Sequence, residues 1–139
     1  MIGLDGFQHL PAYLGPGQQA MLLSEIRAVM AAAPLFAPTM PRTGKPFSVR
    51  MTNCGPLGWV SDKSGGYRYQ PTHPVTGRPW PAMPAMLLDI WDRAARYRVR
   101  PEACLVNYYV PGARMGSHRD EDEEDLRAPV TLGKLPCAH

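Results

Sequence analysis

The stretch A-C-L-V-N-Y-Y-V, residues 103–110, is the clearest β-strand in the sequence. It combines apolar, β-branched and aromatic residues, and Pro111-Gly112 closes it. Residues 114–118 are expected to form the next strand and to lead into an acidic loop.

Two helices are expected before these strands. Apolar residues recur at helical spacing between Gln18 and Ala33, and the flanking Gly15-Pro16-Gly17 and Pro34 predict a helix over about 17–33. Pro84 suits the first turn of a second helix, whose apolar face continues to about Tyr97.

Short extended segments separate the two helices. Residues 47–54, 58–61 and 67–70 are predicted as strands, with turns at Gly55-Pro56 and at 64–66 and a further turn at Thr76-Gly77. The order helix, mixed strands, helix, strands predicts an α+β fold.

Composition excludes several classes of protein. The chain has 139 residues, of which 45% are apolar, so it forms one small domain. Its apolar stretches are far shorter than the ~20 residues that cross a bilayer, and no secretion signal opens it. Cys54, Cys104 and Cys137 lie in unrelated settings and predict neither a disulfide framework nor a zinc pair. A membrane protein, a disulfide-rich miniprotein and a coiled coil are excluded, and a soluble cytoplasmic domain is expected.

The net charge of +3 hides an asymmetry. Six of the 12 acidic residues are consecutive, at 120–125, and a basic stretch covers residues 93–100. A basic surface attracts nucleic acid. A solvated surface balanced by an acidic loop explains the same pattern, and charge alone favours that explanation.

The H-x-D pattern at His118 and Asp120 is the most informative chemical feature. In an extended segment, residues two apart project from the same face, so these side chains can bind one metal ion together. They supply two thirds of the 2-His-1-carboxylate triad that holds Fe(II) with open positions. A surface histidine beside an acidic loop gives the same short pattern.

Polar and aromatic residues on the preceding strands are further candidates. Asn107 and Tyr109 can hydrogen-bond the oxygens of a small dicarboxylate, or serve as a strand-end amide and a core residue. The aromatic residues of 51–59 and 66–69 can stack on extruded bases or form a small core under a loop. The residues by themselves favour the small core.

These pieces also occur together and in order. P-F-S-V-R-M-T-N-C-G-P-L-G-W, G-Y-R-Y-Q-P, G-R-P-W-P-A-M-P, E-A-C-L-V-N-Y-Y-V-P-G-A-R-M and H-R-D-E-D-E closely resemble the AlkB family of nucleic-acid dealkylases. The resemblance runs from the first residues to about Val130. It implies a partial double-stranded β-helix (jelly roll) over 1–130, with a nucleotide-recognition lid at about 47–80 and a divergent tail at 131–139.

The resemblance also implies a role for each matching residue. His118 and Asp120 match iron ligands, and Asn107 and Tyr109 match contacts to α-ketoglutarate. The residues that match substrate contacts are Met51, which lines the base pocket, the lid residues Trp59, Tyr67 and Tyr69, and Asp122, which meets the alkylated base and is the candidate catalytic carboxylate.

The implied reaction is an oxidative dealkylation. With Fe(II), α-ketoglutarate and O2, family members oxidise the N-alkyl carbon of a base, forming succinate and CO2 and, from a methyl group, formaldehyde. The implied partner is single-stranded or damaged DNA or RNA, with no membrane involved, and the intact family member is expected to be a monomer.

The sequence departs from the family after Val130. A second iron-binding histidine and an arginine for α-ketoglutarate are expected there, and neither His139 nor Arg127 suits those roles. We therefore expect a truncated form that is inactive or weakly active and of low stability. The alternatives are a non-catalytic protein that binds single-stranded nucleic acid and a structural metal module.

Overall fold

The first helix, α1, covers Pro16–Ala32 in the computed structural model, which describes residues 2–4, 7–95, 97 and 99–110. The Gly15 backbone N–H donates to the Gln18 side chain (3.0 Å), and Pro16 occupies the first turn. Proline suits that turn because its missing N–H has no helical partner there. The predicted helix over 17–33 is confirmed.

The second helix follows Pro84 as predicted. It consists of α2, Ala85–Ile90, and a π-helical segment η1, Trp91–Ala95, so it ends two residues before the predicted boundary. At Trp91 the chain leaves the α-helical repeat, and the buried indole donates to the Val99 carbonyl (3.2 Å). Neither helix of the described residues has the length and apolar character that a membrane span requires.

The expected strands are present with slightly different bounds. They are β3 at Arg50–Cys54, β4 at Gly58–Asp62, β5 at Gly66–Gln70 and β6 at Cys104–Tyr108. Two further strands, β1 at Ile2–Leu4 and β2 at Phe7–His9, were not expected; they are short, and among the described residues they pair only with each other. The predicted strand over 114–118 lies outside the described residues.

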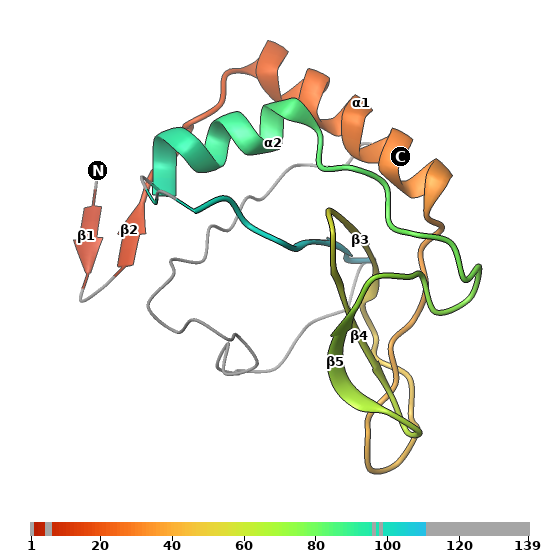
Figure 1. Cartoon of the computed structure of the whole chain (residues 1–139). Coiled ribbons are helices and arrows are strands. Elements are labelled where there is room, and N and C mark those ends of the chain that lie inside the picture. The colour runs from red at the N-terminus through yellow and green to blue at the C-terminus, as the bar shows by residue number, and fades with distance from the viewer. Residues whose placement is uncertain (1, 5–6, 96, 98, 111–139) are drawn as a thin grey trace.

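The strands form small antiparallel sheets. β4 and β5 make a hairpin (Figure 1), whereas β3 pairs with β6, which lies far along the chain. This pairing places Cys54 directly opposite Cys104. The prediction of unrelated settings for these cysteines was therefore wrong, because a pairing between distant segments leaves no local signal. The helices and small antiparallel sheets confirm the coarse α+β arrangement.

An aromatic core holds the hairpin against α1. Trp80 packs with Ala33 and Val60, and its ring centroid lies 5.2 Å from that of His73 and 6.1 Å from that of Phe36. The indole N–H donates to the Gln70 carbonyl at the end of β5 (2.8 Å). This core is built from residues that were not candidates for the site, and it includes none of the aromatic residues of 51–59 and 66–69 for which the sequence left a small core under a loop open.

His73 is a structural member of this core. The residue is 2% exposed, and Nε2 lies 2.7 Å from the Pro34 carbonyl oxygen. Nδ1 accepts the backbone N–H groups of Val75 and Thr76, at 3.0 and 3.1 Å. Both ring nitrogens are thus engaged by backbone, and His73 ties the turn after β5 to the end of α1.

Candidate functional site

An aromatic stack lies on one face of the β4–β5 hairpin. The rings of Trp59 and Tyr67 are stacked, with centroids 5.5 Å apart and planes 25° apart. Phe47 approaches Trp59 from the preceding loop, with centroids 6.3 Å apart. Tyr67 is 48% exposed and Trp59 is half-buried, so the stack lies at the surface, outside the Trp80 core.

Tyr69 shares this face of the hairpin. It is the register partner of Trp59, and it is half-buried. Side chains opposite each other in an antiparallel pair lie on one face, as do residues two apart in a strand. The structure therefore brings together the three aromatic residues that the sequence selected on these two strands.

Asn53 holds Trp59 in place. Its amide donates to the Trp59 carbonyl (3.0 Å) and its Oδ1 accepts the Trp59 backbone N–H (2.9 Å). The fully buried Asn53 side chain thus makes the two backbone hydrogen bonds that a neighbouring strand would make, and it links β3 to β4. Asn53 was not predicted as a site residue, because its only local signal is an amide two positions before Gly55.

A groove runs beside the stack. It has a volume of about 610 Å³ and is lined by residues 40–43 and by Tyr67. Arg42 gives the groove a positive charge. The loop that forms its other wall is fixed to β4, because the Ser61 hydroxyl donates to the Thr39 carbonyl (2.6 Å) and the Thr39 N–H donates to the Ser61 carbonyl.

Met51 and Asn107 meet across the β3–β6 pair. They are direct register partners, and Met51 is 1% exposed whereas Asn107 is exposed. Met51 exchanges both of its backbone hydrogen bonds with Phe36 on the other side of β3, so Met51 and Asn107 form a non-hydrogen-bonded pair. In such pairs the side chains approach closely.

Tyr109 follows β6 and is 49% exposed, which argues against the core role that the sequence left open for it. It lies two residues after Asn107, and both side chains are exposed. The amide and the phenol are therefore available to an oxygen-rich ligand.

An ion pair braces the tip of the hairpin. Arg68 contacts both carboxylate oxygens of Asp62, at 3.0 and 3.1 Å, and the Gly65 N–H donates to the same carboxylate (2.7 Å). Hydrogen bonds from Arg68 and then from Gly65 lower the pKa of Asp62 to about 2. Both side chains are about a third exposed, which limits the energy of the pair.

The basic stretch after α2 is partly neutralised. Arg93 pairs with Asp89 (3.3 Å), and Arg100 pairs with Asp92 (2.9 Å). Arg96 and Arg98 lie outside the described residues. The paired arginines fit the solvated-surface explanation of the charge pattern, and the positive charge that lines the groove beside Tyr67 is that of Arg42.

Three of the predicted site residues lie outside the described part of the chain, namely His118, Asp120 and Asp122. Among the residues that the structure describes, no group of three or more histidine, cysteine, aspartate or glutamate side chains is placed to hold a metal ion. The predicted iron and catalytic residues therefore stay predictions.

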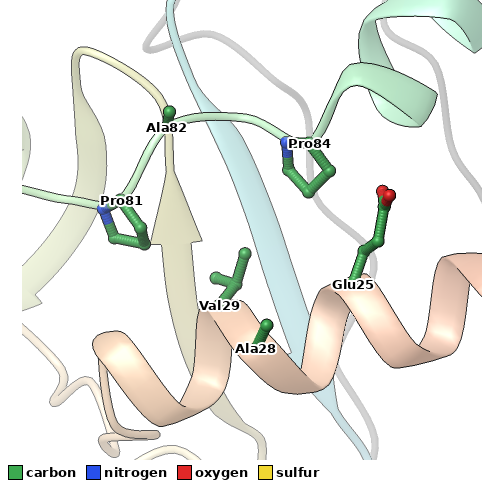
Figure 2. A pocket seen from close by; sticks show the side chains of 6 residues that line it. All are labelled: Glu25, Ala28, Val29, Pro81, Ala82 and Pro84. Carbon is green, nitrogen blue, oxygen red and sulfur yellow. The ribbon is translucent and has the colours of Figure 1, made fainter.

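A second, smaller pocket lies away from the stack. It has a volume of about 260 Å³ and is lined by α1 and by the segment leading into α2 (Figure 2). Its wall is mostly apolar, with the Glu25 carboxylate at one end facing Pro84. Within the described residues it holds none of the predicted site residues.

Comparison with known proteins defines the class. The model of the 2OG-Fe(II) oxygenase superfamily matches residues 6–132, and the chain belongs to this family. Within the family the chain is AlkB-like. It is 48% identical over 127 residues to the alpha-ketoglutarate-dependent dioxygenase AlkB homolog of Caulobacter vibrioides, a match that covers 91% of this chain and 57% of that protein.

The AlkB proteins of two other bacteria give a similar result. Identity is 43% over 118 residues to alpha-ketoglutarate-dependent dioxygenase AlkB of Escherichia coli, covering 82% of this chain and 54% of that protein. The corresponding protein of Salmonella typhimurium is 42% identical over 118 residues. The chain thus spans a little over half the length of these relatives, and the predicted AlkB resemblance is confirmed.

Proposed function

We propose that this chain belongs to an α-ketoglutarate- and Fe(II)-dependent dioxygenase that removes alkyl groups from ring nitrogens of bases in DNA or RNA. The described residues supply its nucleotide-recognition surface. We further propose that β3 and β6 belong to a jelly roll that encloses the reaction site. This proposal rests on membership of the oxygenase family together with the exposed stack of Trp59 and Tyr67.

The stack is the observation that carries the nucleotide part of the proposal. Every base presents a flat π-face, and stacking on an aromatic side chain contributes ~1–3 kcal/mol per base. Tyr67 lines both the stack and the groove, and Arg42 adds a positive charge on the opposite wall. A single strand lying in this groove would contact Arg42 through a phosphate and the stack through a base.

Asn107 and Tyr109 fit α-ketoglutarate. Their uncharged amide and phenol groups lie two residues apart and can donate to the oxygens of a dicarboxylate. Met51, opposite Asn107, would place an apolar wall between this ligand and the base. The short segment after β6 leads from these residues to the proposed iron ligands.

His118 and Asp120 would hold the iron, since one imidazole and one carboxylate on the same face of an extended segment match the ligand types of the family's metal. When bound, Fe(II) and α-ketoglutarate activate O2 for oxidation of the N-alkyl carbon. Asp122 would face the alkylated base, whose ring carries a positive charge that a carboxylate stabilises.

The proposed nucleotide recognition can be tested on the 139-residue chain itself. Fluorescence anisotropy is measured with a labelled single-stranded oligonucleotide that carries one 1-methyladenine, and with the unmodified oligonucleotide. We expect tighter binding of the methylated strand and a loss of about 10-fold in affinity for Trp59→Ala, because a stacking contact of ~1–3 kcal/mol disappears. Tyr13→Ala is the matched control, since Tyr13 is 45% exposed and does not line the groove.

Turnover is then tested with Fe(II), α-ketoglutarate and O2, with formaldehyde and succinate as the products measured. Release of both products from the methylated strand supports the dioxygenase. Binding without turnover supports the second candidate, a non-catalytic protein that binds single-stranded nucleic acid, which the stack and Arg42 favour by themselves. If the wild-type chain and the Trp59→Ala variant bind the methylated and the unmodified strand with the same affinity, both candidate functions are contradicted.

A further inference from the structure

Two cysteines face each other across β3 and β6. Cys54 ends β3, Cys104 begins β6, and the two are direct register partners although 50 positions separate them in the sequence. Cys54 is 0% exposed, whereas Cys104 is only partly buried. One sulfur is therefore within reach of a small solute, and the other lies behind it in the sheet.

The backbone pattern fixes the kind of pair that they form. The N–H and C=O of Met51 point away from β6, toward Phe36, and the peptide groups of successive residues alternate in a strand. The peptide groups of Cys54, three residues later, therefore point toward β6. In such hydrogen-bonded pairs the Cα atoms lie about 5.5 Å apart, which falls within the range of disulfides.

The two thiols differ in acidity. They hydrogen-bond each other, and this bond, with burial, raises the pKa of Cys54 far above its usual value. The same hydrogen bond lowers the pKa of Cys104. Cys104 is thus the group that becomes a thiolate, with Cys54 as the S–H donor beside it. A partly exposed thiolate next to a second thiol is the arrangement typical of peroxide-sensing cysteines.

We propose that Cys54 and Cys104 form a reversible disulfide between β3 and β6 when the protein meets a hydroperoxide such as hydrogen peroxide. The Cys104 thiolate attacks a peroxide oxygen, the O–O bond breaks, and the second oxygen leaves as water after taking a proton. The Cys104 sulfenic acid is then attacked by the Cys54 sulfur, which gives up its proton, and the sulfenic oxygen leaves as a second water.

Atoms and electrons balance over these two steps, since two thiols lose two electrons and two protons and one hydrogen peroxide becomes two waters. The disulfide would restrain two segments that are far apart in the chain, and such cross-links stabilise a fold mainly by constraining its unfolded state. Hydrogen-bonded strand pairs hold Cβ atoms slightly farther apart than most disulfides, so the bond is expected to be easily reduced.

The test is peptide mapping of the full chain under non-reducing conditions, before and after hydrogen peroxide. We expect a Cys54–Cys104 cross-linked peptide, a mass decrease of about 2 Da, and full reversal by dithiothreitol. The Tm of the oxidised chain is expected to rise by at least about 4 °C. Cys137→Ser is the matched control and should form the same link.

Cys104→Ser should abolish the link and leave Cys54 unmodified, because the buried thiol lacks the neighbouring thiolate. Cys54→Ser, which keeps a hydrogen-bond donor beside Cys104 but cannot form a disulfide, should instead trap Cys104 as a sulfenic acid, which dimedone labels. Two results would overturn the proposal: a wild-type chain whose Cys54 and Cys104 stay reduced under peroxide that oxidises free cysteine, or a link that uses Cys137 in place of either residue.

Discussion

Asn53 illustrates how one side chain positions a surface that it does not itself form. Its amide closes two hydrogen bonds with the backbone of Trp59 from a fully buried position. Removal of one partner of a buried hydrogen bond destabilises the fold by more than the bond itself stabilises it, because the polar groups left behind stay away from water without a partner. The orientation of the exposed Trp59–Tyr67 stack therefore depends on a residue that is buried beneath it.

We predict that Asn53→Ala lowers the free energy of unfolding by about 1–3 kcal/mol, because two partly buried backbone groups of Trp59 lose their partners. The measurement is urea denaturation followed by circular dichroism. Ser64→Ala is the control; Ser64 lies at the exposed hairpin tip, and its loss should cost less than about 0.5 kcal/mol. Equal stability of the two variants would contradict the role of Asn53.

Gly58 allows the Trp80 ring to lie against the backbone of β4. A Cβ atom built at this position would fall 2.2–2.6 Å from three atoms of the indole. We predict that Gly58→Ala destabilises the chain by at least about 2 kcal/mol, because the core must shift to admit a methyl group. Gly17→Ala in the first turn of α1 meets no atom within 4 Å and should stabilise by about 0.5 kcal/mol. Thermal unfolding compares both variants.

At the scale of elements, the β4–β5 hairpin carries its own pH dependence. The pKa of Asp62 is lowered to about 2 by Arg68 and Gly65, so the folded hairpin favours the ionised carboxylate. That stabilisation is fully present above the unfolded pKa of about 3.9 and is lost as the pH falls through about 2. Because the pair is partly exposed, its contribution is at most about 1 kcal/mol.

We therefore predict that the wild-type chain loses more stability than Asp62→Asn when the pH is lowered from 5 to about 2. Thermal melts at these two pH values, with the difference taken between the proteins, measure this effect. Raising the salt concentration should reduce the difference, since it screens the exposed pair. A variant as sensitive to acid as the wild type would show that Arg68 and Asp62 contribute nothing to the hairpin.

The elements also show what local sequence can and cannot predict. Helix α1 and the hairpin follow from spacing, proline and glycine, which act within a few residues. The pairing of β3 with β6 joins distant segments, so neither the facing cysteines nor the contact of Met51 with Asn107 was predicted. Phe47 was likewise not selected, because nothing in its neighbourhood indicates that it packs on Trp59.

At the scale of the whole molecule, the proposed function divides between two parts of the chain. The aromatic stack lies within residues 47–70, and the proposed iron ligands His118 and Asp120 follow β6 in the sequence. The hairpin is held by Asn53, Trp80 and the Thr39–Ser61 contacts, none of which involves a metal. Nucleotide binding should therefore survive the loss of the metal ligands.

We predict that the double variant His118→Ala, Asp120→Ala loses binding of Fe(II), or of Co(II) as its spectroscopic substitute, but keeps its affinity for a single-stranded oligonucleotide within about twofold. Trp59→Ala should show the reverse, with metal binding unchanged and oligonucleotide affinity about 10-fold lower. Absorption titration and anisotropy on the same preparations separate the two effects, and addition of EDTA to the wild type should mimic the double variant. If the metal ligands and Trp59 instead affected both measurements equally, the recognition surface and the metal site would form one cooperative unit, and the division argued from the contacts around the hairpin would be wrong.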